Sequence, residues 1–233
     1  MEKCSLLIEN TMVMTDAQTL QTGMDIAVCG EKIAAVVKHG ERKFQAEKLI
    51  CGKEKLIMPG LIDSHMHTGQ QLLKGLVLDA KPIIWTRVML PFESTLTSEK
   101  MQLSAKAAAL EMIKSGTSGF VDAGSYFMEA AAEVYVQSGL RGCLSFSTMD
   151  EEGLPESIAM DAVQAVKETD ILYEHWNNQG NLKVYYSLRA LNSCSDKLTE
   201  LAAEHAGDRG AMLQAHMNEY QGEIDGIIRR EGM

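Results

Sequence analysis

The feature that most constrains the fold is an alternation of apolar strands with amphipathic helices, which begins near residue 57. The expected strands cover residues 57–67, 119–124, 141–148, 182–188 and 211–217. The expected helices cover residues 98–114, 126–138, 155–176 and 195–206, with a last amphipathic stretch at 221–231. Strands that alternate with helices form parallel βαβ units. The sequence therefore predicts an α/β fold, and five strands leave open either a doubly wound sheet or a barrel.

Helix boundaries are predicted from residues that favour helix ends. Pro155 suits a first helical position, so the helix at 155–176 is expected to begin there. Ser195 can cap the next helix, which is expected to end at Ala206, just before Gly207.

Residues 1–56 have a different pattern, made of short β-leaning runs separated by Gly, Asn and charged turns. Gly30, Glu31 and Lys32 lie between two apolar runs and indicate a hairpin. We therefore expect two domains, a β-strand subdomain at 1–56 and an α/β domain at 57–233.

Charge and cysteine content narrow the function classes. The net charge is −10, which disfavours binding to nucleic acid or to an anionic membrane. No apolar run is long enough to span a membrane. Five dispersed cysteines without a CxxC pair indicate reduced thiols and a cytoplasmic protein.

Two histidines end the first strand of the alternating region. His65 and His67 are two residues apart, so both side chains point to one face of a strand, and Asp63 precedes them on that face. Parallel α/β sheets place their sites at the carboxyl ends of the strands. Two imidazoles there can bind one metal ion, and the alternative is an ordinary pair of surface histidines.

A third histidine favours the metal site. His216 is expected at the end of the strand at 211–217, and Glu219 follows three residues later. The other histidines, His39, His175 and His205, lie in a turn or on helices and are expected to be structural. Three imidazoles with a nearby carboxylate suit Zn²⁺ or Fe²⁺ with a position left for water. A carboxylate beside such water can carry its proton.

These residues resemble the amidohydrolase superfamily. The stretch IMPGLIDSHMHTGQQLLKGL is similar to its first-strand motif, and ALEMIKSGTSGFVDAG and LQAHMNEY are similar to segments of its triazine hydrolase and aminopurine deaminase branch. The resemblance implies a (β/α)₈ TIM-type barrel with a small β-sandwich and one divalent metal, Zn²⁺ or Fe²⁺. It gives His65, His67 and His216 the role of metal ligands and Glu219 that of general acid and base.

The mononuclear branch fits better than the two-metal branch. Two-metal members carry a carboxylated Lys at the end of strand four, whereas Lys183 lies at the start of that strand here and Arg189 follows its end. The resemblance then implies deamination of an aminated N-heterocycle by a metal-bound hydroxide, with loss of ammonia. Dechlorination or amide hydrolysis by a similar site is the alternative.

Four residues are candidates for the substrate pocket or its support. Glu93 matches a ribose-binding position of nucleoside deaminases, or is an exposed Glu near a helix start. Arg189 stands where those enzymes place a substrate-binding His, and it can pair with a carboxylate or oxo group instead. Trp85 can stack on a flat ring or pack. Asp122 can belong to the mouth, although a structural role is favoured.

Residues 69–97 form a long connection, broken by Pro82 and Pro91, of the kind that often covers a substrate.

The barrel is expected to be incomplete, because only about five of eight strands are present. An open barrel leaves unpaired strand edges, which favour association. We therefore expect an N-terminal fragment of an enzyme that acts on a small heterocycle, and a homo-oligomer. The alternative is a catalytically inactive barrel fragment that is stabilised by association.

Overall fold

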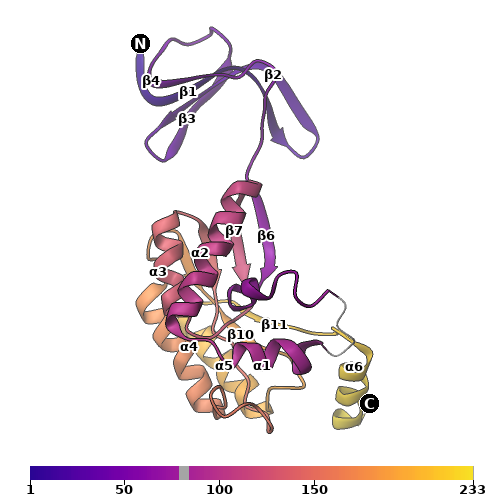
Figure 1. Cartoon of the computed structure of the whole chain (residues 1–233). Coiled ribbons are helices and arrows are strands. Elements are labelled where there is room, and N and C mark those ends of the chain that lie inside the picture. The colour runs from indigo at the N-terminus through magenta and orange to yellow at the C-terminus, as the bar shows by residue number, and fades with distance from the viewer. Residues whose placement is uncertain (79–83, 233) are drawn as a thin grey trace. The chain divides into compact units, whose positions relative to one another are not determined.

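The computed structural model describes residues 1–78 and 84–232 and contains two compact units, Met1–Gly60 and Leu61–Met233 (Figure 1). The division falls after Gly60 rather than at residue 56. The first unit extends past residue 56 because Leu56 and Ile57 still pair with its first strand. Pro82, expected to break the long connection, lies outside the described residues.

The first unit is a β-sheet. Its strands are β1 (Glu2–Asp16), β2 (Thr19–Cys29), β3 (Lys32–Lys38), β4 (Phe44–Cys51) and β5 (Leu56–Ile57). The sheet order is β3-β2-β1-β4, and β5 pairs with β1. Strands β2 and β3 are antiparallel and meet at Gly30 and Glu31, which confirms the expected hairpin. The strands are longer than the apolar runs alone predicted.

The second unit has the alternating parallel pattern. Its strands are β6 (Leu61–Met66), β7 (Thr117–Asp122), β8 (Arg141–Leu144), β9 (Leu182–Val184), β10 (Tyr186–Leu188) and β11 (Leu213–Ala215). Strands β6-β7-β8-β9 form one parallel sheet, and β10-β11 form a parallel pair. A parallel bridge between Thr148 and Leu188 joins the chain after β8 to β10. The expected strand at 182–188 is thus two segments divided at Tyr185, whose N–H is donated to the Leu144 carbonyl.

Helices connect these strands. They are η1 (Thr68–Leu73, 3₁₀), η2 (Trp85–Met89, π), α1 (Leu90–Glu93), α2 (Ser98–Ser115), α3 (Met128–Ser138), α4 (Ala162–Trp176), α5 (Asp196–Arg209) and α6 (Gln221–Glu231). Figure 1 shows α2 beside α3 and α4 beside α5, on one side of the strands. Apolar side chains between helices and strands form the core, including Met101, Phe120, Leu144, Leu172 and Leu198.

The two outermost strands of the second unit, β6 and β11, have exposed apolar residues. Leu61 and Ile62 on β6 are 53% and 72% exposed, and Met212 beside β11 is 62% exposed. Within the described ranges β6 pairs with β7 alone, and β11 with β10 alone. Strands of a closed parallel barrel are buried on both faces. These edges therefore match the expected incomplete barrel.

The start of α4 differs from the expectation. The helix begins at Ala162, not at Pro155, because the Asp161 side chain caps it by accepting the Gln164 N–H at 2.8 Å. The Pro155 carbonyl instead accepts the N–H groups of Ile158 and Ala159, which closes a turn before the helix.

The end of α5 also differs. The helix continues through Gly207 to Arg209, and Gly210 ends it with a φ of 60°. Ser195 caps its start as expected, since its hydroxyl accepts the Leu198 N–H at 3.1 Å.

No helix among residues 1–78 and 84–232 is long and apolar enough to cross a membrane. All five cysteines carry free thiols.

Candidate metal centre

The structure brings three histidines together from two distant parts of the chain. His65 lies in β6, His67 directly follows that strand, and His216 directly follows β11. Each offers a ring nitrogen, and these nitrogens all lie within 4.8 Å of one another. The ring centroids are 4.9–5.2 Å apart. The cluster forms because β6 and β11 both run toward the same end of the barrel wall, where parallel strands place their sites.

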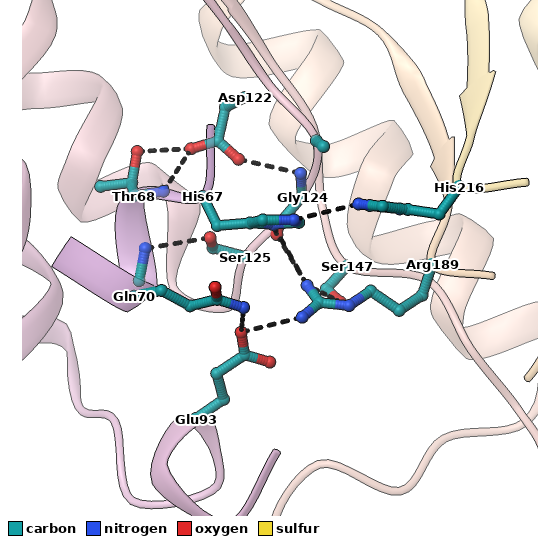
Figure 2. A network of polar contacts seen from close by, with 12 residues as sticks. His67, Thr68, Gln70, Glu93, Asp122, Gly124, Ser125, Ser147, Arg189 and His216 are labelled. Atoms are coloured by element: carbon teal, nitrogen blue, oxygen red, sulfur yellow. Dashed lines mark hydrogen bonds and ion pairs between the residues drawn. The ribbon is translucent and has the colours of Figure 1, made fainter. Parts of the chain in front are cut away.

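The orientation of the His67 ring is set by its hydrogen bond to the backbone. Nδ1 of His67 lies 2.8 Å from the Gly124 carbonyl oxygen, which can only accept, so Nδ1 carries the proton (Figure 2). Nε2 therefore has a free lone pair and faces His216. Burial, together with the nearby Arg189 cation, lowers the pKa of His67 to about 2 and that of His216 to about 4. Both rings are neutral at pH 7, as metal ligands must be.

The spacing of the imidazoles fits one divalent ion. Nε2 of His67 and Nε2 of His216 are 3.0 Å apart. Two nitrogens bound to one ion at about 2.0–2.1 Å lie roughly 2.9–3.4 Å apart at coordination angles of about 90–110°. A set of three imidazoles is also a donor set that suits Zn²⁺ and Fe²⁺. His65, His67 and His216 can therefore hold a divalent metal.

A pocket of about 340 Å³ opens beside the histidines. Its lining combines the three imidazoles with polar, aromatic and apolar groups: His65, Met66, His67, Gln70, Trp85, Met89, Arg189, Ala190, His216 and Glu219. This volume suits a small ligand. Six of the seven residues expected for the site, all except Glu93, thus line one cavity.

Glu219 is placed by the start of α6. Its backbone N–H is donated to Oε2 of Glu223 at 2.8 Å, and Glu223 is buried. The Glu219 side chain is exposed and lines the pocket with the histidines. The loop between β11 and α6 thus presents a carboxylate to the cavity, where it can accept and donate protons.

Glu93 and Arg189 form a buried ion pair. Arg189 Nη2 lies 3.0 Å from Glu93 Oε1, and the two side chains are 3% and 0% exposed. Gln70 Nε2 donates to the same oxygen at 2.6 Å. Figure 2 shows the pair beneath His67. The alternative of an exposed Glu93 is wrong, because α1 places this carboxylate in the interior, against Arg189.

The Arg189 guanidinium is shared among several groups. Nη1 donates to the Gly124 carbonyl at 3.2 Å and to Ser147 Oγ at 3.5 Å. Its central carbon lies 5.8 Å from the centre of the Trp85 ring, which is a cation–π contact. Three protein acceptors use only part of the five N–H groups of an arginine. Arg189 and Trp85 both line the pocket, although the Arg189 side chain is only 3% exposed.

Other candidates lie outside the pocket. Asp63 accepts the His65 N–H at 3.2 Å and lines a neighbouring cavity on the α2 side of β6. Lys183 donates to Asn178 at the start of β9, away from the histidines, as expected. The remaining histidines each contact a carboxylate elsewhere: His39 with Asp25, His175 with Glu129 and His205 with Asp170.

Asp122 lies close to the site but does not line the pocket. It is buried at the end of β7 and hydrogen-bonds to Thr68 and Gly124, which agrees with the structural role favoured for it. Burial raises the pKa of Asp122 to about 6, against the opposing effect of these hydrogen bonds.

Three further residues of the site were not among the candidates from the sequence. Gln70, Gly124 and Ser147 act through contacts with residues 23–65 positions away. Gly124 has the clearest signature in retrospect, because a glycine at a strand end marks a close backbone approach.

Gly124 is expected to tolerate no side chain. Its φ is 108°, and a Cβ there would lie 2.9 Å from the Phe146 carbonyl oxygen. Gly153 is a matched control, with a φ of 85° and no atom within 4 Å of its Cβ position. Gly153→Ala should cost about 1 kcal/mol of unfolding free energy for the backbone alone. Gly124→Ala should cost about 2 kcal/mol more, because overpacking adds to that strain. Urea unfolding of both variants checks this, and equal losses would contradict it.

Comparison with known proteins places this site in a family. A model of the amidohydrolase family matches residues 56–232, so the chain belongs to that family. It is 31% identical over 229 residues to a 5-methylthioadenosine/S-adenosylhomocysteine deaminase of Thermococcus onnurineus, covering 98% of this chain and 53% of the relative. It is 30% identical to a 5'-deoxyadenosine deaminase of Methanosarcina mazei, covering 97% of this chain and 52% of the relative.

A solved structure supports the same fold. The crystal structure of an adenosine deaminase from Xanthomonas campestris with bound zinc matches with a TM-score of 0.91 and 22% identity. The match covers all of this chain and 53% of the other. The chain thus spans about half the length of the relatives it matches. Family membership and the α/β barrel class agree with the expectations from the sequence, and both of these relatives are named as deaminases.

Proposed function

We propose that this chain carries the metal centre and the proton-transfer residue of an enzyme that hydrolytically deaminates an aminated N-heterocycle. One observation carries the proposal: three clustered imidazoles and the Glu219 carboxylate line the same pocket. The named activities of the relatives support a deaminase.

We assign metal binding and proton transfer to different residues of this chain. His65, His67 and His216 would hold one divalent ion, of which Zn²⁺ is the first choice and Fe²⁺ the second. When bound, such an ion lowers the pKa of a coordinated water toward neutrality. Glu219 then takes a proton from water and gives it to a ring nitrogen or to the leaving amine, as a general base and acid.

Substrate recognition is proposed for Trp85, Arg189 and Glu93. Trp85 offers a flat face to a heterocycle, and Arg189 offers its spare N–H groups to an oxo group or carboxylate of the substrate. Glu93 does not line the pocket, and it would act by fixing Arg189 and Gln70, which do. An oxo-substituted aminoheterocycle is therefore favoured over a plain adenosine.

We further propose that activity needs the rest of a barrel. The exposed apolar residues at β6 and β11 support the proposal that further strands pair along both of these edges. The 233-residue chain alone is expected to associate into homo-oligomers through these edges. The free cysteines are consistent with a cytoplasmic location.

The test compares wild-type protein with Glu219→Gln, both expressed from the whole gene and loaded with Zn²⁺ or Fe²⁺. Wild type should release ammonia from at least one oxo-substituted aminoheterocycle. Glu219→Gln should bind metal equally and lose about 10²- to 10⁴-fold in kcat, since it keeps the shape but cannot carry the proton. Retained turnover would remove Glu219 from this role.

The same assays separate the alternatives. Release of chloride from a chlorinated heterocycle, with no ammonia from any substrate, would favour dechlorination. An intact homo-oligomer that binds no metal after reconstitution would favour the catalytically inactive fragment.

A further inference from the structure

Asp122 contacts two backbone segments with its one carboxylate. Oδ2 accepts the Thr68 N–H at 2.9 Å and also the Thr68 hydroxyl. Oδ1 accepts the Gly124 N–H at 2.8 Å. The residue is 0% exposed, so water does not compete for these bonds. The carboxylate therefore fixes the chain after β6 against the chain after β7.

Both of these segments help to set the position and orientation of the His67 ring. Thr68 is the next residue along the chain, so its fixed N–H sets the backbone that carries the imidazole. Gly124 supplies the carbonyl oxygen to which Nδ1 of His67 donates, at 2.8 Å. Figure 2 shows Asp122 above this arrangement, with dashed contacts to Thr68 and Gly124 on either side of His67. One carboxylate thus positions both the ring and its acceptor.

The backbone of Asp122 also contacts the strand that carries His216. Gln214, two residues before His216 on β11, donates its side-chain amide to the Asp122 carbonyl oxygen at 2.8 Å. The same amide donates to Ser145 Oγ at 2.6 Å. Asp122 is therefore hydrogen-bonded to the residue that follows His67 and to β11, the strand that His216 follows.

The remaining polar groups of Thr68 also have hydrogen-bond partners. Thr68 Oγ1 lies 2.8 Å from the Tyr135 hydroxyl. Because the Thr68 hydroxyl gives its proton to Asp122, Tyr135 is the donor. Ser104 Oγ donates to the Thr68 carbonyl at 2.6 Å. A network whose members all have partners holds one geometry, and a partly satisfied one does not.

We propose that Asp122 is a positioning residue for the metal centre, which keeps His67 in the Nδ1–H form with Nε2 free for the ion. This inference rests on the proposed metal site. Replacing a group that orients a metal ligand through hydrogen bonds typically lowers metal affinity about 10- to 100-fold. Asp122 itself touches neither the ion nor the substrate pocket, so its effect is transmitted through Thr68 and Gly124.

The first test uses Asp122→Asn in the 233-residue chain. Asparagine keeps the shape, but its NH₂ group must face an N–H donor of either Thr68 or Gly124, so one of the two anchors is lost. Zinc affinity, measured by competition with a chromophoric chelator, should fall about 10- to 100-fold. Val166→Ala is the control for a general loss of stability, because Val166 is buried in α4. It should leave zinc affinity within twofold of wild type.

The second test reads the ring directly and needs no metal. In ¹⁵N-labelled, metal-free wild type, the His67 resonances should report the Nδ1–H form, with their assignment made from the His67→Gln spectrum. In Asp122→Asn they should report a mixture of both neutral forms. Should Asp122→Asn fail to fold, an Nε2–H form of His67 in wild type would still overturn the inference.

The outcomes separate this inference from the proposed function. A wild-type chain that binds no zinc contradicts the metal site, whatever the tautomer. A wild-type chain that binds zinc, with Asp122→Asn within twofold of it and an unchanged His67 spectrum, overturns the positioning role alone. An equal loss of affinity in Val166→Ala would also overturn it.

Discussion

The His216→Ala variant is expected to lose zinc binding almost completely. Removing His216 would leave only His65 and His67, which come from one strand end, as the imidazoles that could hold the ion. The loss of zinc affinity should exceed the roughly 10- to 100-fold loss that is typical when a group that hydrogen-bonds to a metal ligand is replaced. Chelator competition with the 233-residue chain measures it.

His205→Ala is the matched control for this experiment. His205 lies on α5 with Nδ1 2.9 Å from Asp170 Oδ2, away from the cluster. Zinc at about 100 times its Kd should stabilise wild type and His205→Ala by about 2.7 kcal/mol, and His216→Ala hardly at all. If His216→Ala keeps its affinity within threefold, the three-histidine site is not the zinc site.

The sequence predicted the second unit well because its elements follow from local rules. The helix at 98–114 is α2, where the Thr97 side chain accepts the Lys100 N–H and Gly116 ends the helix with a φ of 82°. The histidine cluster was also predictable, although His67 and His216 are 149 positions apart. Parallel strands carry their last residues to one end of the sheet, so residues that end two such strands meet.

The supporting contacts were not predictable in the same way. Glu93 and Arg189 are 96 positions apart, and Glu93 lies within the long connection rather than at a strand end. No periodicity or strand rule tells which way such a connection folds. The burial of Glu93 depends on tertiary packing of η2 and α1, and sequence reasoning therefore left its exposure open.

Two sequence signals for a helix start compete before α4. Pro155 does favour a first helical turn, but Asp161 offers a stronger N-cap six residues later. Two competing start signals within one stretch make a boundary uncertain by a full turn or more. The Asp161 cap starts the helix, and Ile158, in the turn before it, packs into the core.

The Arg189→Met variant is expected to lose about 3–5 kcal/mol of unfolding free energy, because it leaves the buried Glu93 carboxylate without its cation. Glu93→Gln should also destabilise the protein, since it leaves Arg189 uncompensated. The double variant Glu93→Gln/Arg189→Met should be less destabilised than the sum of the two, by about 0.5–3 kcal/mol. Urea unfolding measures each corner of this cycle. Arg42→Met is the control, because Arg42 pairs with Glu2 on the surface and should contribute little.

The Glu93–Arg189 pair should also affect zinc affinity, and it should do so through its charges rather than through packing. Arg189 Nη1 lies 3.3 Å from Nδ1 of His67, so its positive charge opposes a bound cation as it already opposes protonation of that ring. Glu93 offsets this charge through the 3.0 Å ion pair. Glu93→Gln should therefore weaken zinc binding about tenfold, from roughly 1.4 kcal/mol of uncompensated repulsion at the edge of the site. Removing the cation as well, in the double variant, should restore the affinity. Equal affinities in Glu93→Gln and in the double variant would show that the pair supports the fold without acting on the metal.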